Sequence, residues 1–442
     1  MVPMTAAWRK ALARRRRQLM QAAGDGAILV VPAAPERIRS RDTHYPYRQD
    51  SDFWYLSGFA EPEAVLVLVP GRSHVESILF CRDRDPEREG WDGPRLGPEG
   101  AVEQLGMDDA YPIADIDDIL PGLLEGRRCV HYHLGRDADF DLKLIGWLNR
   151  VRAQVRHGAQ PPQEFLELGH LLDEQRLFKS ADEIRLMQRA ADISVEAHRA
   201  AMRAARPGVR EYELQAEIER VFRLHDAEPA YASIVGAGAN ACVLHYRDNR
   251  GKSKPGELVL VDAGAEYRGY AADITRTFPV GGRFSKEQRV LHELVCAAQA
   301  AAMAQARPGV AWEAGHHAAV ETLCEGLLSL GLLKGRLEHV IESEAYKRFY
   351  RHKTGHWLGL DVHDVGEYRL DGQSRLLEPG MVFTIEPGLY IPDEPDIPAK
   401  WRGIGIRIED DVLITADGHR VLTGALERSA DEIETLMAAA TA

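Results

Sequence analysis

The sequence predicts an α/β N-terminal domain followed by an α+β domain with an internal pseudo-twofold duplication. Three observations lead to this fold class. Short apolar runs alternate with helical stretches in the first part of the chain, a domain boundary with the linker-like segment HGAQPPQ follows near 157–173, and two motifs then recur in the same order. At 442 residues the chain exceeds one ordinary domain. We place the two domains at residues 1–173 and 174–442.

The composition is that of a globular protein with an acidic balance. The chain is 45% hydrophobic and 28% charged, which suffices for a sizeable core. The net charge of -13, without any basic stripe studded with aromatic residues, argues against nucleic acid or a membrane surface as a partner. No run approaches the roughly 18 apolar residues of a membrane span.

Cysteine usage and the N-terminus indicate the compartment. The five cysteines are scattered and form no CxxC pair, which indicates a reducing, cytoplasmic environment. The first 24 residues contain arginines and no acid, as a targeting segment would. They also lack serine and the apolar centre of a secretory signal, so we predict a basic N-terminal helix instead.

The first domain reads as alternating strands and helices. Strands are expected at 26–32, 64–70 and 76–81, and helices at 114–124 and 142–155. The aromatic segment 45–59 lies between strands and is interpreted as core and turn filling. The Pro/Gly-rich segment 83–100 is expected to be an exposed loop, in which Trp91 either serves recognition or covers a core.

The second domain begins with a long helix and contains a repeat. Ser180 opens a helical pattern that ends near Ala205, with Glu183 placed for a capping box. The motif ARPGV occurs at 205–209 and 306–310, each time between two helical patterns, and PGELVLVDAG at 255–264 is echoed by PGMVFTIEPG at 379–388. Each half therefore reads as helix, turn, helix, and strands that end in a carboxylate.

The two halves of this repeat supply acidic residues at matching places. A strand at 258–261 delivers Asp262, and a second strand carries Asp273 after a turn at 267–269. Such a hairpin makes the two aspartates cross-strand neighbours to within about one residue. Because neighbouring carboxylates repel, a cation between them is one interpretation, and two strand ends in solvent is the other.

The second half adds further candidate ligands. Glu386 matches Asp262 in the repeat, Glu409 follows in the strand pattern 403–415, and His356 and His363 lie shortly before Glu386. Each histidine alone is more often structural. Four carboxylates and one imidazole suit two divalent ions bridged by carboxylates, and oxygen-rich ligation favours Mn, with Co, Zn or Mg as alternatives.

These residues and their flanking sequences resemble the pita-bread metallopeptidase family, which includes methionine aminopeptidase, prolidase and aminopeptidase P. The segments YPYRQDSDFWYLSGFAEPEAVLVL and RLFKSADEI are similar to the bacterial aminopeptidase P (Xaa-Pro aminopeptidase) branch. The resemblance covers nearly the whole chain. It implies a dinuclear site in which Asp262 holds one metal, His356 and Glu386 hold the other, and Asp273 and Glu409 bridge the two.

The resemblance also implies an activity. The enzyme would remove the N-terminal residue from peptides with proline second, by attack of a hydroxide that bridges the metals. Glu386 would also handle the proton, while His245 and His363 would bind substrate and stabilise the developing oxyanion. Arg407, two residues before Glu409, is expected to orient carboxylates. The matching substrate-site segments contain two more residues, Tyr390 and His352.

The family builds part of the proline pocket from a neighbouring subunit, which makes Trp91, Asp42 and Arg156 candidates and implies a homotetramer or homodimer. The alternative function is an Xaa-Pro dipeptidase with the same metals. A creatinase-like hydrolase or a noncatalytic binding protein of this fold would lack the acidic ligands, and all five ligand positions are intact here.

Overall fold

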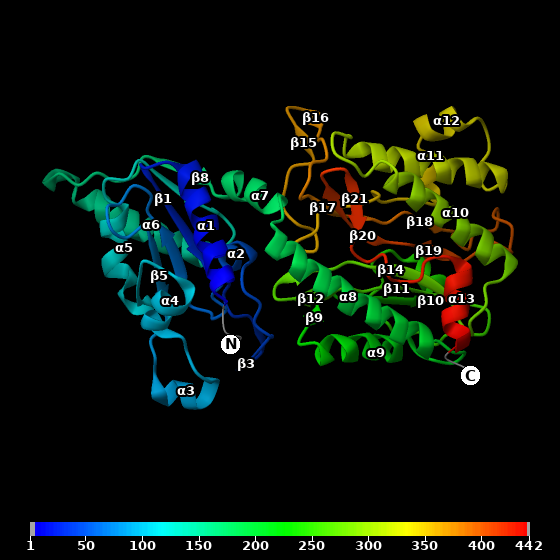
Figure 1. Ribbon diagram of the computed structural model, residues 1–442, viewed down its shortest axis with the longest axis horizontal. Coiled ribbons are helices and arrows are strands. Elements are labelled where there is room, and N and C mark those ends of the chain that lie inside the picture. The colour runs from blue at the N-terminus through cyan, green and yellow to red at the C-terminus, as the bar shows by residue number, and fades with distance from the viewer. Residues whose placement is uncertain (1–4, 440–442) are drawn as a thin grey trace. The chain divides into compact units, whose positions relative to one another are not determined.

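The computed structural model describes residues 5–439 and divides into two units, Met1–Gln175 and Arg176–Ala442 (Figure 1). The first unit is built on a six-stranded mixed sheet with the strand order β6-β5-β4-β1-β7-β8. Its strands are β1 (Ala27–Pro32), β4 (Val65–Leu68), β5 (Ser77–Cys81), β6 (Asp109–Pro112), β7 (Cys129–Tyr132) and β8 (Glu164–Glu167), and a separate hairpin joins β2 (Ile38–Ser40) to β3 (Thr43–His44).

The helices of the first unit surround or extend from this sheet. They are α1 (Ala6–Ala23), α2 (Ser51–Ser57), α3 (Pro86–Asp92), α4 (Gly97–Leu105), η1 (Ile113–Asp115), α5 (Ile116–Leu124), α6 (Ala138–Ala153), η2 (Val155–His157) and α7 (Gly169–Leu177). Apolar side chains of α5 and α6, such as Leu120 and Trp147, are buried with those of β1, β4 and β7 in one core. The predicted α/β class, the three predicted strands and the N-terminal helix are confirmed.

One expectation for the first unit was wrong. The segment 83–100 is not a loop throughout, because it contains α3 and the start of α4. Asp85 accepts hydrogen bonds from the backbone amides at 87 and 88, and Pro86 stands at the first turn, so local capping outweighs the loop-like composition. The region of the predicted domain boundary, 157–173, contains β8 just after the linker-like segment 157–163, and β8 pairs with β7 as the edge strand of the sheet.

The second unit contains two pairs of long helices and several small sheets. Its helices are α8 (Ala181–Ala204), α9 (Glu211–Leu224), η3 (Gly238–Cys242), α10 (Lys286–Met303), α11 (Glu313–Ser329), α12 (Leu337–Glu342), η4 (Ala345–Arg348) and α13 (Ala430–Ala439). Its strands are β9 (Glu228–Pro229), β10 (Ile234–Ala237), β11 (Leu258–Asp262), β12 (Ala265–Tyr267), β13 (Tyr270–Ala271), β14 (Thr275–Pro279), β15 (Arg369–Leu370), β16 (Gln373–Ser374), β17 (Val382–Ile385), β18 (Gly388–Tyr390), β19 (Gly405–Arg407), β20 (Asp410–Thr415) and β21 (Gly418–Val421).

The predicted duplication is visible in these elements. The first ARPGV motif lies between α8 and α9, the second lies between α10 and α11, and each helix pair precedes a three-stranded antiparallel sheet, β10-β11-β14 and β17-β20-β21. One core buries α8, α9 and α13 against β11, and another buries α10 and α11 against β17 and β20. The capping box of Ser180 and Glu183 is also confirmed.

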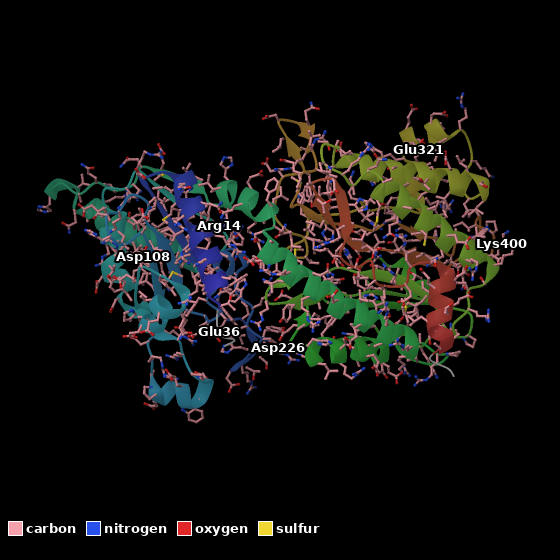
Figure 2. All side chains as sticks on the ribbon, in the orientation of Figure 1. Arg14, Glu36, Asp108, Asp226, Glu321 and Lys400 are labelled. Carbon is pink, nitrogen blue, oxygen red and sulfur yellow. The ribbon has the colours of Figure 1, made fainter. Side chains whose placement is uncertain are left out.

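Charged side chains lie on the surface of the second unit. Figure 2 shows charged side chains on the outside of the second unit, among them Glu321 and Lys400, both exposed. Within residues 5–439, no helix combines the length and the apolar character that crossing a bilayer demands.

Candidate metal centre

A cavity of about 590 Å³ in the second unit gathers side chains from both halves of the repeat. Asp262 and Asp273 come from the first half, and Glu386 and Glu409 come from the second. Nine of the site residues predicted from the sequence line this cavity: His245, Asp262, Asp273, His352, His356, His363, Glu386, Arg407 and Glu409.

The two aspartates lie diagonally across one antiparallel pair. Asp262 ends β11 and pairs with Thr275 of β14, two residues beyond Asp273. The expected register was therefore wrong by one residue, because the turn has two residues instead of three: Arg268 and Gly269, both at positive φ, connect β12 to β13. Cross-strand partners lie on the same face of a sheet, and so do residues two apart on one strand. The carboxylates of Asp262 and Asp273 therefore point to the same face.

Tyr231 joins these two carboxylates. Its hydroxyl lies 2.6 Å from Oδ1 of Asp262 and also contacts Oδ1 of Asp273. Burial and the two aspartates raise the pKa of Tyr231 well above its ordinary value, so the phenol stays protonated and can donate. No sequence signal pointed to this residue, because it is distant from both aspartates in the chain.

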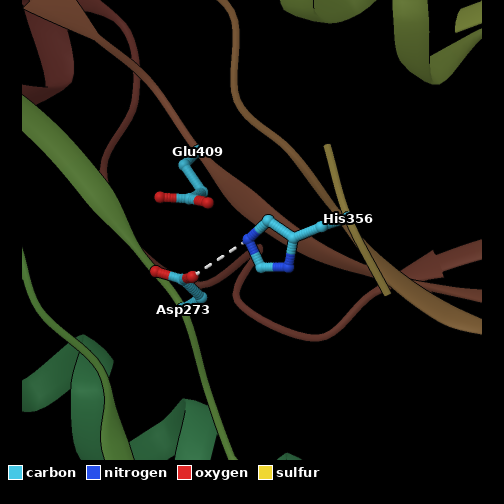
Figure 3. Close-up of side chains that lie close together, drawn as sticks. All are labelled: Asp273, His356 and Glu409. Atoms are coloured by element: carbon cyan, nitrogen blue, oxygen red, sulfur yellow. Dashed lines mark ion pairs between the residues drawn. The ribbon is translucent and has the colours of Figure 1, made fainter. Parts of the chain in front are cut away.

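His356 faces the aspartate from the second half. Its Nδ1 donates to the carbonyl of Trp357 at 3.0 Å, which leaves Nε2 directed at Oδ2 of Asp273 (3.4 Å) and Oε1 of Glu386 (3.5 Å). The backbone here approaches β17 closely, and a Cβ at Gly355 would clash with the carbonyl of Thr384. Figure 3 shows His356, Asp273 and Glu409 converging on one point.

The carboxylates are buried together with too little compensating charge. Burial raises the pKa of Asp273, and burial with the charge of Asp273 raises the pKa of Glu386 to about 7 and that of Glu409 well above its usual range. Burial lowers the pKa of His356, but Asp273 and Glu386 outweigh this effect and raise it to about 9. The site is thus arranged for positive charge.

This donor set fits a divalent metal. Asp273, His356 and Glu409 each offer a ligand atom, and these three atoms lie within 4.8 Å of one another. Carboxylate oxygens and an imidazole nitrogen are ligands for Mn, Zn and similar ions. The Trp357 carbonyl fixes the imidazole tautomer in the way that protein partners of metal-bound histidines do.

Arg407 is the buried cation beside this group. It is 4% exposed, and it donates to Oδ2 of Asp262 at 2.6 Å and to the hydroxyl of Tyr390 at 2.8 Å. The Tyr390 hydroxyl lies 2.8 Å from Nε2 of His352, whose pKa burial lowers to about 3. A neutral His352 therefore lines the cavity at the end of a chain of hydrogen bonds that starts at Asp262.

The two outer histidines reach the cavity from different segments. The ring of His363 lies 4.3 Å from the ring of His356, and burial together with His356 lowers its pKa. His245 is exposed and lines the cavity from the segment after η3. Both are placed to touch a molecule in the cavity.

Three expected substrate residues lie in the first unit and are not among the lining residues of this cavity. Trp91 is 85% exposed on α3, and both Asp42, beside the β2–β3 hairpin, and Arg156, in η2, are exposed. Their assignment to a pocket stays a prediction.

Two threonines at the site were not predicted from the sequence. Thr275 donates to Oε2 of Glu409 at 2.6 Å, and Thr354 lies 2.8 Å from Nδ1 of His316, which lines the cavity. Thr275 stands two residues after Asp273, so the alternation of the strand could have placed it on the same face. Thr354 also contacts the hydroxyl of nearby Tyr350 at 2.7 Å, but His316 comes from a distant helix and could not have been read from the sequence.

Comparison with known proteins decides the family. Residues 185–416 match metallopeptidase family M24, and residues 12–132 match the N-terminal domain of aminopeptidase P. The chain belongs to metallopeptidase family M24. The resemblance noted from the sequence is confirmed, and the second unit of this family member has the expected pita-bread fold.

Individual relatives match this M24 protein over nearly their whole length. The chain is 45% identical to the Xaa-Pro aminopeptidase of Escherichia coli over 98% of both chains, and 44% identical to that of Haemophilus influenzae over 96% of both. The structure of Pseudomonas aeruginosa aminopeptidase PepP matches with a TM-score of 0.97 at 55% identity and covers 100% of both chains. A variant of E. coli aminopeptidase P in complex with substrate matches with a TM-score of 0.95 at 44% identity, over 98% of this chain and 99% of that one.

Proposed function

We propose that the protein is a metal-dependent Xaa-Pro aminopeptidase, which removes the first residue of peptides whose second residue is proline. One observation carries this proposal: four carboxylates and a histidine from both halves of the duplication meet at a single cavity. The relatives that match over nearly the full length are named Xaa-Pro aminopeptidases, and E. coli aminopeptidase P has been solved both with substrate and with product. These names favour an aminopeptidase over a dipeptidase.

The proposed cofactor is a pair of divalent ions, with Mn favoured and Co or Zn as alternatives. Asp262 would hold one ion, His356 and Glu386 the other, and Asp273 and Glu409 would bridge them. The grouping of Asp273, His356 and Glu409 supports this arrangement. When bound, such ions polarise a carbonyl and make water nucleophilic near neutral pH.

The protein residues would bind and orient the substrate around this centre. A free α-amino group at a carboxylate-rich site anchors the N-terminus of the peptide, which limits cleavage to the first residue. Glu386 lines the cavity beside His356 and would take the proton from the attacking water and pass it to the leaving amine. His245 and His363, both at the cavity, would donate hydrogen bonds to the substrate carbonyl as charge develops on its oxygen.

Three further residues would keep the side chains of the metal centre in position: Arg407, Tyr390 and His352. Arg407 is in contact with both Asp262 and Tyr390, so it orients one expected metal ligand and fixes the tyrosine hydroxyl that meets His352. His352, itself at the cavity wall, would contact the substrate.

We further propose that the first domain, residues 1–173, completes the proline pocket of residues 174–442 in a neighbouring subunit. The exposed indole of Trp91 supports this role, since an apolar ring surrounded by water is suited to cover a proline ring. Asp42 and Arg156, also exposed, would line the same pocket. The protein would then be a homotetramer or homodimer, and the cysteine pattern favours the cytoplasm.

The test uses protein stripped of metal and reloaded with Mn. Release of the N-terminal residue is followed from an Xaa-Pro-Xaa tripeptide, the matching Xaa-Pro dipeptide and a peptide without proline. Mn-dependent cleavage of the tripeptide is the expected result. Cleavage of the dipeptide alone would instead identify a prolidase, and no cleavage with Mn, Co or Zn would refute the enzymatic proposal.

A further inference from the structure

His245 occupies a segment whose position is set by its backbone. The segment 237–251 leads from β10 toward β11 and carries His245 into the lining of the cavity. The side chain is exposed, and within residues 5–439 its ring makes no hydrogen bond. Whatever holds this segment therefore decides how far the imidazole reaches into the cavity.

A single buried carboxylate holds the segment at both ends and in the middle. Glu211, the first residue of α9, is 1% exposed. Its Oε1 accepts from the amide of Ala237 and from Nδ2 of Asn240, both at 2.8 Å. Its Oε2 accepts from the hydroxyl of Tyr246 at 2.8 Å and from the amide of Gly251.

The chemistry of this contact requires a carboxylate. All four partners donate, and an ionised carboxylate only accepts hydrogen bonds. The NH2 group of a side-chain amide would place one donor opposite another. The negative charge also lies at the N-terminus of α9, where the helix dipole stabilises it. The packing leaves no spare room, since a Cβ at Gly251 would lie 2.6 Å from Oε1 of Glu211.

The contact reaches the neighbour of His245. Tyr246 is the next residue in the chain, and its hydroxyl is tied to Glu211 and to Nδ2 of Asn240 at 3.0 Å. A second anchor, Asn249, bonds the amide of Val235 at 3.0 Å, but it lies four residues beyond the histidine. Glu211 thus contacts the residue that directly follows His245.

We propose that Glu211 is a positioning residue that sets the placement of His245 in the cavity. Loss of its charge weakens the side-chain contacts to Ala237, Tyr246 and Gly251 together, and the turn that carries the imidazole is held less firmly. Because a displacement of about 1 Å can cost on the order of 100-fold in rate, turnover should fall. The catalytic consequence rests on the proposed function, whereas the anchoring itself does not.

The test is a double-mutant cycle in Mn-loaded protein with an Xaa-Pro-Xaa tripeptide. Glu211→Gln should lower kcat at least about tenfold and change KM less. If Glu211 acts through His245, the loss of kcat in Glu211→Gln cannot exceed the loss in His245→Ala. Adding Glu211→Gln to His245→Ala should then lower kcat by less than about a further twofold. Glu213→Gln is the matched control, because Glu213 is exposed in the same helical turn and bonds the amide of Arg210 instead of the segment.

A second measurement needs no activity. Hydrogen exchange of the amides of Ala237 and Gly251 should speed up in Glu211→Gln and stay unchanged in Glu213→Gln. If the wild-type protein cleaves no peptide, the proposed function fails, and the exchange data still decide whether Glu211 anchors the segment.

Two results would overturn the inference. One is an equal loss of kcat from Glu211→Gln with and without His245, which would mark a general structural effect. The other is unchanged kcat and exchange. If Glu211→Gln does not fold, Tyr246→Phe removes one donor without leaving a void. A smaller kcat loss that disappears in the His245→Ala background supports the inference, and a loss that persists there contradicts it.

Discussion

Replacing Arg276 with methionine should destabilise the second unit strongly, although Arg276 is not among the residues that line the cavity. Arg276 lies on β14 with 0% exposure. Its guanidinium donates to Oδ1 of Asp410 at 2.8 Å and to the carbonyls of Glu409 at 2.6 Å and Glu427 at 2.9 Å. It also donates to the carbonyls of Thr275 at 3.1 Å and Leu426 at 3.4 Å. Methionine has a similar length but no donor, so it leaves a buried carboxylate and four carbonyls without this partner.

The structure sets the size of the effect. Removing one partner of a buried ion pair costs about 3–5 kcal/mol, because the other charge stays buried. Asp410 would keep hydrogen bonds from Gln299 at 2.9 Å and Thr423 at 2.7 Å, which limit this loss, while the freed carbonyls add to it. We expect a decrease of about 3–5 kcal/mol in the free energy of unfolding, which corresponds to about 6–10 °C in Tm for a unit of this size.

Calorimetry of metal-free protein provides the assay. Arg420→Met is the control, since Arg420 is exposed on β21 and its loss should cost at most about 0.5 kcal/mol. Adding Asp410→Asn to Arg276→Met removes both charges and should restore at least about 2 kcal/mol. The reasoning is refuted if Arg276→Met costs less than about 1 kcal/mol, or if the double variant is no more stable than the single one.

Four further predictions concern the site and one buried ion pair. Asp273→Ala should abolish Mn binding and peptidase activity together, and an active, metal-free variant would contradict the dinuclear proposal. His363→Ala should keep the metals, measured by metal analysis, and lower kcat about 100-fold; lost metal would make it a ligand. Trp91→Ala should raise KM for proline peptides with metal content unchanged, and unaltered kinetics would remove the first domain from the pocket. Burial alone would raise the pKa of Asp364, but Lys179, 2.9 Å away, helps to hold it below its ordinary value. The lowered pKa stabilises the folded state above about pH 4, and this stabilisation is lost as pH falls through the folded pKa. Asp364→Asn should therefore lower the free energy of unfolding by about 3–5 kcal/mol at pH 7 and by much less at pH 3, as measured by urea unfolding. A cost independent of pH would contradict this assignment.

Local patterns predicted the elements of the second unit well. The capping box at Ser180, the two ARPGV motifs and the apolar strand at 258–261 depend on interactions within a few residues, which the order of residues already specifies. The repeat also implied that Asp262 and Glu386 occupy equivalent places, and both line the cavity. Their metal-binding roles stay predictions.

The errors arose where local preferences compete. Pro and Gly around Trp91 indicated a loop, yet Asp85 caps a short helix there. The turn before β13 takes two residues instead of three, because Arg268 and Gly269 both adopt positive φ. One residue of turn length shifts the whole register, so the pairing of Asp262 with Thr275 could not be read from composition.

The sequence by itself determined the two-part fold class, the duplication and the kinds of side chain that could hold a metal, because these follow from periodicity and from motifs that are continuous in the chain. Only the tertiary structure decided which side chains from distant parts of the chain contact the site residues and the segments that carry them. Tyr231 meets two aspartates, Arg276 meets Asp410, and Glu211 holds the segment of His245, each across a long stretch of chain. Such contacts depend on how helices and sheets pack, and a buried polar group finds its partner only once that packing exists.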